Sequence, residues 1–313
     1  MLWDIILSII YGIVEGITEW LPISSTGHMI ILEELLHKGS MSDEFFTELY
    51  LVVIQLGAIM AVIVIFWKEI WPFGVKNNTH PFAKEGIGRY VMKDKIIMWL
   101  KIALACIPAA IVGVLFDDWL DEHLYNYVVV AIALIVFGVA FIVVEKLIAN
   151  RNPVVKTVNQ INWGHALAIG FFQLLAAIFP GASRSGSTIV GSLAIGIKRE
   201  AAAKFTFFLA IPVMFGASLL KIVKYDGEIE GRWVVCLLVG MVTAFFVSLM
   251  VIRKLMAFIK KHSFSCFGYY RIALGVLVLI LGAIGIIGAS SGSAATETTE
   301  TIAQTAAAAV ILF

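Results

Sequence analysis

Two short stretches interrupt the apolar runs of this chain and determine how it folds. Residues 15–28 read EGITEWLPISSTGH, and residues 180–188 read PGASRSGST. In each stretch a proline is followed by a cluster of Ser, Thr and Gly. Because proline disfavours a helical conformation in the residue before it, helices are expected to end near Leu21 and Phe179. Each stretch therefore predicts a break between two helices.

The chain around these breaks is more apolar than a soluble protein. Of its 313 residues 60% are hydrophobic and 14% are charged, whereas a soluble domain has about 25% charged residues. Apolar runs of ~20 residues are long enough to cross a bilayer as helices. The apolar stretches are approximately 2–22, 23–37, 46–67, 96–116, 125–148, 161–180, 182–197, 202–222, 231–256 and 269–288. This pattern excludes a soluble protein, and the net charge of +1 gives no indication of a nucleic-acid partner.

The two broken regions also align with each other, which predicts an internal repeat. The aligned pairs are Pro22 with Pro180, Gly12 with Gly170, Glu15 with Gln173, and Ser25 with Ser183. Each half, residues 1–150 and residues 151–288, then consists of a helix–loop–helix region (2–37 and 161–197) followed by three apolar spans. In membrane proteins such repeats often form a binding site at their interface. Residues 289–313 are rich in Ser, Ala, Thr and Glu and predict a disordered tail.

The topology of the repeat depends on whether each broken region returns to the side from which it entered. If it does, the first half crosses the membrane three times and the second half is inverted. Most of the 23 basic residues then lie on one side, which the positive-inside rule assigns to the cytoplasm, and the acidic residues 117–122 form a loop outside. Ten ordinary spans would give the same charge distribution. The polar breaks favour re-entrance, because irregular backbone at membrane depth must be buried in protein or line a wet cavity.

The predicted fold class is therefore all-α. The protein is expected to be a polytopic membrane protein, an inverted-topology repeat with two re-entrant helix–loop–helix regions and six full spans.

Glu15 and Glu19 lie four residues apart, so a helix places both carboxylates on one face. A charge within an apolar helix costs ~2.5–3.5 kcal/mol on insertion scales. Two like charges destabilise each other further unless a proton or a cation lies between them. The structural explanation is a solvated pair at headgroup level. The functional explanation is a general base or a site for a divalent cation.

Ser24, Ser25, Thr26 and His28 follow the first proline. Ser or Thr before an apolar run is a common helix N-cap, which is the structural explanation of these hydroxyls. A cap does not explain His28, which would be costly against lipid. With Glu19 close by, Ser25 or His28 is a candidate nucleophile activated by a neighbouring base.

The second stretch places one arginine among small residues at a predicted helix start. Backbone N–H groups and the helix dipole favour an anion there, and the planar fork of Arg184 suits bidentate contact with phosphate. An arginine extending to the membrane interface is the structural alternative, but its small neighbours favour a phosphate cradle. The candidate phosphate-binding residues are Ser24, Thr26, Gln173, Gly181, Ser183, Arg184, Ser185, Ser187 and Thr188.

These two stretches resemble the signature motifs of the undecaprenyl-pyrophosphate phosphatases, the bacitracin-resistance family, and the similarity covers about residues 5–288. The resemblance implies hydrolysis of undecaprenyl pyrophosphate to undecaprenyl phosphate, which recycles the lipid carrier for cell-wall synthesis and confers bacitracin resistance. It also implies dependence on a divalent cation (Mg²⁺ or Ca²⁺), a homodimer, and a bacterial plasma-membrane site facing the extracytoplasmic side. The residues that match the family's acidic pair, serine, histidine and arginine are Glu15, Glu19, Ser25, His28 and Arg184.

Several alternatives remain open at this level. The nucleophile is Ser25, His28 or water. A transporter or lipid flippase would also use inverted repeats with broken helices, although a nucleophile and base beside an anion clamp are not needed for transport. The motif set of acid-phosphatase-type lipid phosphatases is missing, as is the Gly-x-Ser-x-Gly element expected of an intramembrane serine protease.

Overall fold

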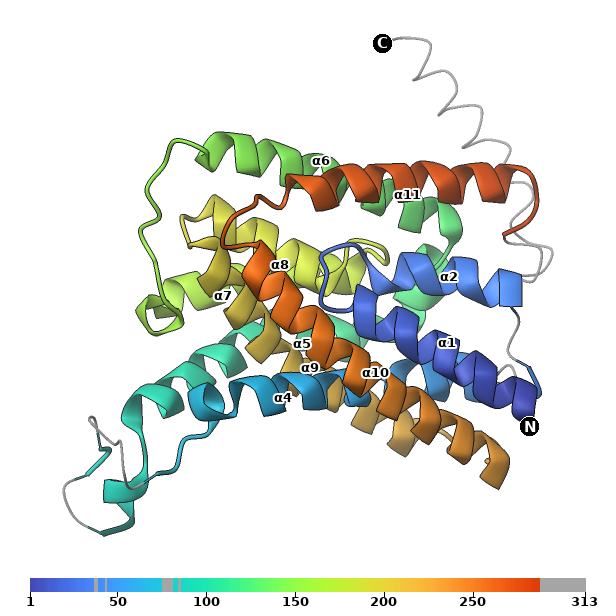
Figure 1. Ribbon diagram of the computed structural model, residues 1–313, viewed down its shortest axis with the longest axis horizontal. Coiled ribbons are helices and arrows are strands. Elements are labelled where there is room, and N and C mark those ends of the chain that lie inside the picture. Colours follow the sequence, from blue (N-terminus) through green and yellow to red (C-terminus); the bar gives the residue numbers. More distant parts are fainter. Residues whose placement is uncertain (37–38, 43, 75–80, 84–85, 288–313) are drawn as a thin grey trace.

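The computed structural model describes residues 1–36, 39–42, 44–74, 81–83 and 86–287 (Figure 1). The tail predicted at 289–313 lies outside these residues. The longer helices are α1 (Leu2–Thr18), α2 (Ser25–Leu36), α4 (Gln55–Ile70), α5 (Lys93–Leu124), α6 (Tyr127–Ile148), α7 (Trp163–Ile178), α8 (Arg184–Ala194), α9 (Arg199–Lys224), α10 (Gly231–Phe258) and α11 (Ser265–Ala283). The shorter helical segments are η1 (Phe45–Tyr50), α3 (Leu51–Val53), η2 (Gly86–Tyr90) and η3 (Val158–Gln160). The described part of the chain has no strand beyond isolated bridges, so the all-α prediction is confirmed.

Six helical segments in the described residues are long and apolar enough to cross a membrane, as predicted. They are Phe45–Ile70, which joins η1, α3 and α4, together with the first part of α5 (Lys93–Gly113), α6, α9, α10 and α11. The prediction of a loop at residues 117–122 is wrong, because α5 continues to Leu124. Nothing in that acidic stretch breaks a helix, and the break comes at Asn126, whose side chain accepts from the N–H of Val129 at the start of α6.

Both predicted breaks are present. α1 ends at Thr18 and α2 begins at Ser25, whereas α7 ends at Ile178 and α8 begins at Arg184. These four helices have 17, 12, 16 and 11 residues. At 1.5 Å per residue the longest of them falls short of a hydrocarbon core of ~30 Å. In Figure 1 the start of α1 and the end of α2 both lie toward the right, an arrangement compatible with re-entrance.

The two halves of the chain interlock. α1 packs on α10 and α7 packs on α5, so the first helix of each half contacts a span of the other half. The aligned glycines lie at these contacts. A Cβ on Gly12 would lie 2.5 Å from the carbonyl oxygen of Gly240, and a Cβ on Gly170 would lie 2.6 Å from that of Ala105. Small residues let the helix backbones approach closely, and the matched packing is compatible with an inverted repeat.

The structure corrects the alignment of the two loops by one residue. Ser24 and Ser183 both adopt positive φ, 74° and 68°. Each serine caps the following helix, since its Oγ accepts from the N–H of the residue three positions on, at 3.3 Å for Gly27 and 3.2 Å for Gly186. Ser24 therefore matches Ser183. The second loop has one more residue between its proline and its cap, which is why alignment on the prolines paired the wrong serine.

This register makes Ser25 the counterpart of Arg184, because each is the first residue of its helix. A serine with positive φ is strained by about 1–3 kcal/mol, and such strain is found mostly at functional sites. Both loops contain one such strained serine, and in each loop a helix begins at the next residue. The hydroxyl comes from one half of the chain and the guanidinium from the other.

Candidate active site

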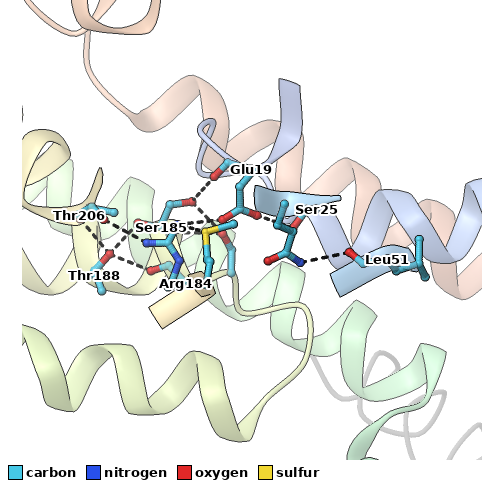
Figure 2. A network of polar contacts seen from close by, with 11 residues as sticks. Glu19, Ser25, Leu51, Arg184, Ser185, Thr188 and Thr206 are labelled. Atoms are coloured by element: carbon cyan, nitrogen blue, oxygen red, sulfur yellow. Dashed lines mark hydrogen bonds and ion pairs between the residues drawn. The ribbon is translucent and has the colours of Figure 1, made fainter. Parts of the chain in front are cut away.

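Glu19 lies between Ser25 of the first broken region and Arg184 of the second (Figure 2). Its Oε1 accepts from a terminal nitrogen (NH2) of Arg184 at 2.8 Å, and its Oε2 accepts from Ser25 Oγ at 3.0 Å. Its backbone carbonyl accepts from Ser185 Oγ at 3.3 Å. The residue is 8% exposed. One buried carboxylate therefore connects the hydroxyl of the first loop with the cation of the second.

The contact between Ser25 and Glu19 has the geometry of a nucleophile beside its base. A hydroxyl that donates to a carboxylate at 3.0 Å can transfer its proton as its oxygen attacks an electrophile. Ser25 is also the first residue of α2, where the unpaired N–H groups of the helix start favour negative charge.

Arg184 is held by Glu19 of the first loop and by Thr206 and Met214 of α9. One terminal nitrogen (NH1) donates to the carbonyl of Thr206 at 3.0 Å, and the other (NH2) contacts Glu19 and lies 3.6 Å from Met214 Sδ. Its Nε has no hydrogen-bond partner within the described residues. The cation is therefore fixed in position and retains a donor for an anion.

Thr188 supports Arg184 and does not point into the site. Its Oγ1 donates to the carbonyl of Arg184 at 2.8 Å and pairs with Thr206 Oγ1 at 2.9 Å. Ser183 caps α8 and its Oγ lies 3.2 Å from Ser185 Oγ. Among the predicted phosphate ligands, Ser183 and Thr188 thus have structural contacts, while the buried Ser187 Oγ has no partner in the described part of the chain.

His28 lies on α2 with both ring nitrogens engaged. Nδ1 is 2.7 Å from the carbonyl oxygen of Ser24, and Nε2 is 2.7 Å from the Tyr270 hydroxyl on α11. Neither contact reaches Glu19 or Ser25. The structure therefore places His28 beside the loop, and the side chain that contacts the Ser25 hydroxyl is Glu19.

Glu15 and Gln173, which the repeat pairs with each other, are both buried, at 1% and 2% exposed. Glu15 interacts electrostatically with Glu19 and Arg184. Its Oε1, and both amide atoms of Gln173, have no hydrogen-bond partner among the described residues. Unsatisfied buried polar atoms are rare and costly, so atoms like these require a water, an ion or a ligand.

The acidic pair fits a divalent cation that takes other ligands from its substrate. The described residues contain no group of three or more His, Cys, Asp or Glu side chains suited to a metal. Mg²⁺ commonly uses one or two carboxylates and completes its shell with water and substrate phosphates. Glu15 and Glu19 can supply the carboxylates, and Glu15 Oε1, which has no hydrogen-bond partner among the described residues, is available as a metal ligand.

Arg271 is a further residue of the site that the sequence analysis did not select. It lies on α11, is fully buried, and donates to the carbonyls of Gly181 and Ala182 at 2.9 Å each and to that of Pro22 at 3.4 Å. One guanidinium thus joins both loops. The available signal was an arginine inside the apolar stretch 269–288, since intramembrane charges are rare and usually functional.

Comparison with known proteins identifies the family. Residues 8–277 match the family described as bacitracin resistance protein BacA. The chain is 51% identical over 281 residues to an undecaprenyl-diphosphatase of Enterococcus faecalis, a match that covers 90% of this chain and 98% of that protein. It is 50% identical over 277 residues to an undecaprenyl-diphosphatase of Acetivibrio thermocellus, covering 88% and 97% of the two chains. This chain belongs to the BacA bacitracin resistance family.

Proposed function

We propose that this protein is an integral membrane phosphatase that hydrolyses undecaprenyl pyrophosphate to undecaprenyl phosphate and inorganic phosphate. The observation that carries the proposal is the contact of Ser25 and Arg184 with the two oxygens of the Glu19 carboxylate. Relatives with about half of their residues identical over nine tenths of the chain are named undecaprenyl-diphosphatase. The activity regenerates the lipid carrier for cell-wall synthesis, and it is the basis of bacitracin resistance.

The first step is attack by Ser25. Its Oγ forms a bond to the terminal phosphorus, the bond from that phosphorus to the bridging oxygen breaks, and undecaprenyl phosphate leaves. The hydroxyl proton passes to Glu19, 3.0 Å away. Water then attacks the phosphoserine, which restores the Ser25 hydroxyl and releases inorganic phosphate. Phosphoryl transfer depends mainly on positioning and charge stabilisation, and the two loops provide both.

Proton transfer to Glu19 also changes the partner of Arg184. In the structure the guanidinium is paired with the Glu19 carboxylate at 2.8 Å. When Glu19 accepts the proton of Ser25 it loses its charge, so the attraction of Arg184 shifts to the phosphoryl oxygens. The cation is therefore strongest toward substrate when negative charge accumulates there, as a group that stabilises the transition state must be.

A divalent cation, Mg²⁺ or Ca²⁺, belongs to the proposal. Glu15 and Glu19 would hold it together with pyrophosphate oxygens, and it would offset the charge of the substrate. The proposed location is the bacterial plasma membrane, with the site open to the extracytoplasmic side. The homodimer implied by the family resemblance stays a prediction.

Phosphate release by the purified protein in detergent tests the activity. We expect release from undecaprenyl pyrophosphate, suppressed by a chelator and restored by added Mg²⁺ or Ca²⁺. A transporter or flippase would release no phosphate, because moving the lipid across a membrane does not break its phosphoanhydride bond. Full activity in excess chelator would contradict the proposed requirement for a divalent cation, but it would still support the proposed phosphatase activity.

Trapping of the covalent intermediate tests the nucleophile. We expect rapid quenching during turnover, followed by peptide mass spectrometry, to find phosphate on Ser25 and none in Ser25→Ala. Ser24→Ala is the matched control. It removes the α2 cap and costs about 0.5–2 kcal/mol of stability, but it leaves the phosphoserine in place. Phosphate on His28 would identify that residue as the nucleophile, and repeated failure to trap any intermediate would favour direct attack by water.

A further inference from the structure

Two adjoining cavities lie at the end of the molecule where α4 ends and α9 begins. One has a volume of about 600 Å³ and is lined by the end of α4, the connection between α6 and α7, and parts of α9 and α10. The other has a volume of about 410 Å³ and lies between the start of that connection, the end of α8, and the start of α9. Lys260 and Glu200 line both cavities. None of the active-site residues described above lines either one.

The larger cavity carries an excess of positive charge. Its basic side chains are Lys156, Lys204, Arg253 and Lys260, against the acidic Glu69 and Glu200. Lys204 is bound to Glu69, with its Nζ 2.7 and 2.8 Å from the two carboxylate oxygens. Lys156, Arg253 and Lys260 form no ion pair with another described residue. Three cations therefore surround a space large enough for a phosphate group.

The smaller cavity extends the same charge. Lys198 is paired with Glu200 at 2.8 Å, and Arg199 is paired with the buried Glu145. Arg151, which also lines this cavity, has no ion pair within the described part of the chain. Across the two cavities the charged side chains without an ion pair are thus all basic, which indicates an anionic ligand.

Tryptophans place these cavities at headgroup depth. Trp67 and Trp71 stack on each other at the end of α4, beside Glu69, and are 45% and 42% exposed. Trp163, at the start of α7, is 49% exposed. Exposed tryptophans gather at the boundary between hydrocarbon and water. In Figure 1 this end, where α4 leads toward α5, lies at the lower left.

The cavity walls combine these cations with apolar side chains. Ile65, Phe66 and Met256 line the larger cavity, and Ile148, Ile195 and Ile259 line the smaller one. A freely soluble anion has no apolar group to contact these side chains. A phospholipid does, because its glycerol backbone and upper acyl chain lie beside its phosphate. Basic pockets between transmembrane helices on the cytoplasmic side are suited to anionic headgroups.

We propose that the two cavities form a binding site for the headgroup of an anionic phospholipid, with its phosphodiester bound by Lys156, Arg253 and Lys260. A headgroup with two phosphodiesters can occupy both cavities across Lys260. The site is separate from the phosphatase centre, so the proposal does not depend on the proposed reaction.

The test compares the double variants R253Q/K260Q and K254Q/K261Q. Both remove two positive charges from the end of α10 and the loop after it, but Lys254 and Lys261 line neither cavity. Each purified protein is titrated in detergent with phosphatidylglycerol, cardiolipin, phosphatidylcholine or inorganic phosphate. Binding is followed by native mass spectrometry and by the shift in Tm.

We expect phosphatidylglycerol and cardiolipin to bind and raise the Tm of the wild type and of K254Q/K261Q. R253Q/K260Q is expected to bind them at least about tenfold more weakly, because each of the two lost cations contributes about 1 kcal/mol near an anionic lipid, or about fivefold in affinity. Phosphate release in detergent should stay at the wild-type level in both variants. Equal weakening in K254Q/K261Q, equal binding of phosphatidylcholine, or equal protection by inorganic phosphate would each overturn the lipid site.

Discussion

Arg184→Ala is expected to lower kcat/KM for undecaprenyl pyrophosphate by about 10³–10⁵-fold, the range over which an arginine stabilises a phosphoryl-transfer transition state. The guanidinium lies 2.8 Å from Glu19 and keeps its Nε–H free of partners within the described residues. Removing it takes away the cation that receives the developing charge. Phosphate release measures the loss, and the thermal unfolding of the same sample reports the fold.

Two variants separate this loss of chemistry from a loss of stability. Arg184→Lys keeps the charge but not the planar fork, so we expect it to recover only a small part of the activity. Arg199→Ala breaks a second pair between a buried glutamate and an arginine, that of Glu145, which contains no residue of either loop. It should lower the Tm and leave kcat near the wild-type value. Near-normal turnover in Arg184→Ala would show that the cation does not act on the phosphate.

Glu19→Gln is expected to reduce kcat by about 10²–10⁴-fold, the usual contribution of a general base. The amide keeps the shape of the carboxylate and can still accept from the Ser25 hydroxyl, but it cannot take its proton. The change should therefore affect kcat more than KM. Steady-state phosphate release at saturating substrate measures the effect, and the same sample should accumulate no phosphoserine.

Glu145→Gln is the matched control for this prediction. Glu145 is buried like Glu19 and accepts from Arg199 and from the N–H of Phe264, two residues that lie outside both loops. Its replacement should cost stability without changing kcat. If Glu19→Gln kept most of its activity, water or His28 would have to supply the base, and the mechanism proposed for Ser25 would be wrong.

Much of the fold could be predicted from the sequence because its causes are local. Apolar runs of spanning length identified the six membrane-spanning segments found in the described residues, and the prolines with their small polar neighbours located both breaks. The end of α5 could not be placed, since residues 117–122 are acidic but contain no residue that stops a helix. The pairing of α1 with α10 and of α7 with α5 depends on contacts between distant segments, and only the glycines hinted at it.

The site was predictable to a similar degree. The convergence of Glu19, Ser25 and Arg184 followed from residue types that are expensive in a membrane. The contact between His28 and Tyr270 did not, because 242 residues separate the two side chains. The correct register of the loops depends on the φ angles of Ser24 and Ser183, which no spacing reveals.

Arg271 lies later in the chain than both loops that its side chain connects. It belongs to α11, the last long helix of the described chain, yet its guanidinium binds carbonyls of both loops, those of Pro22, Gly181 and Ala182. A ribosome makes the loops first and this arginine near the end. The earlier helices can enter the bilayer while the loops still lack their common donor. A chain that ends before α11 therefore carries Glu19, Ser25 and Arg184 but lacks the guanidinium that connects the two loops.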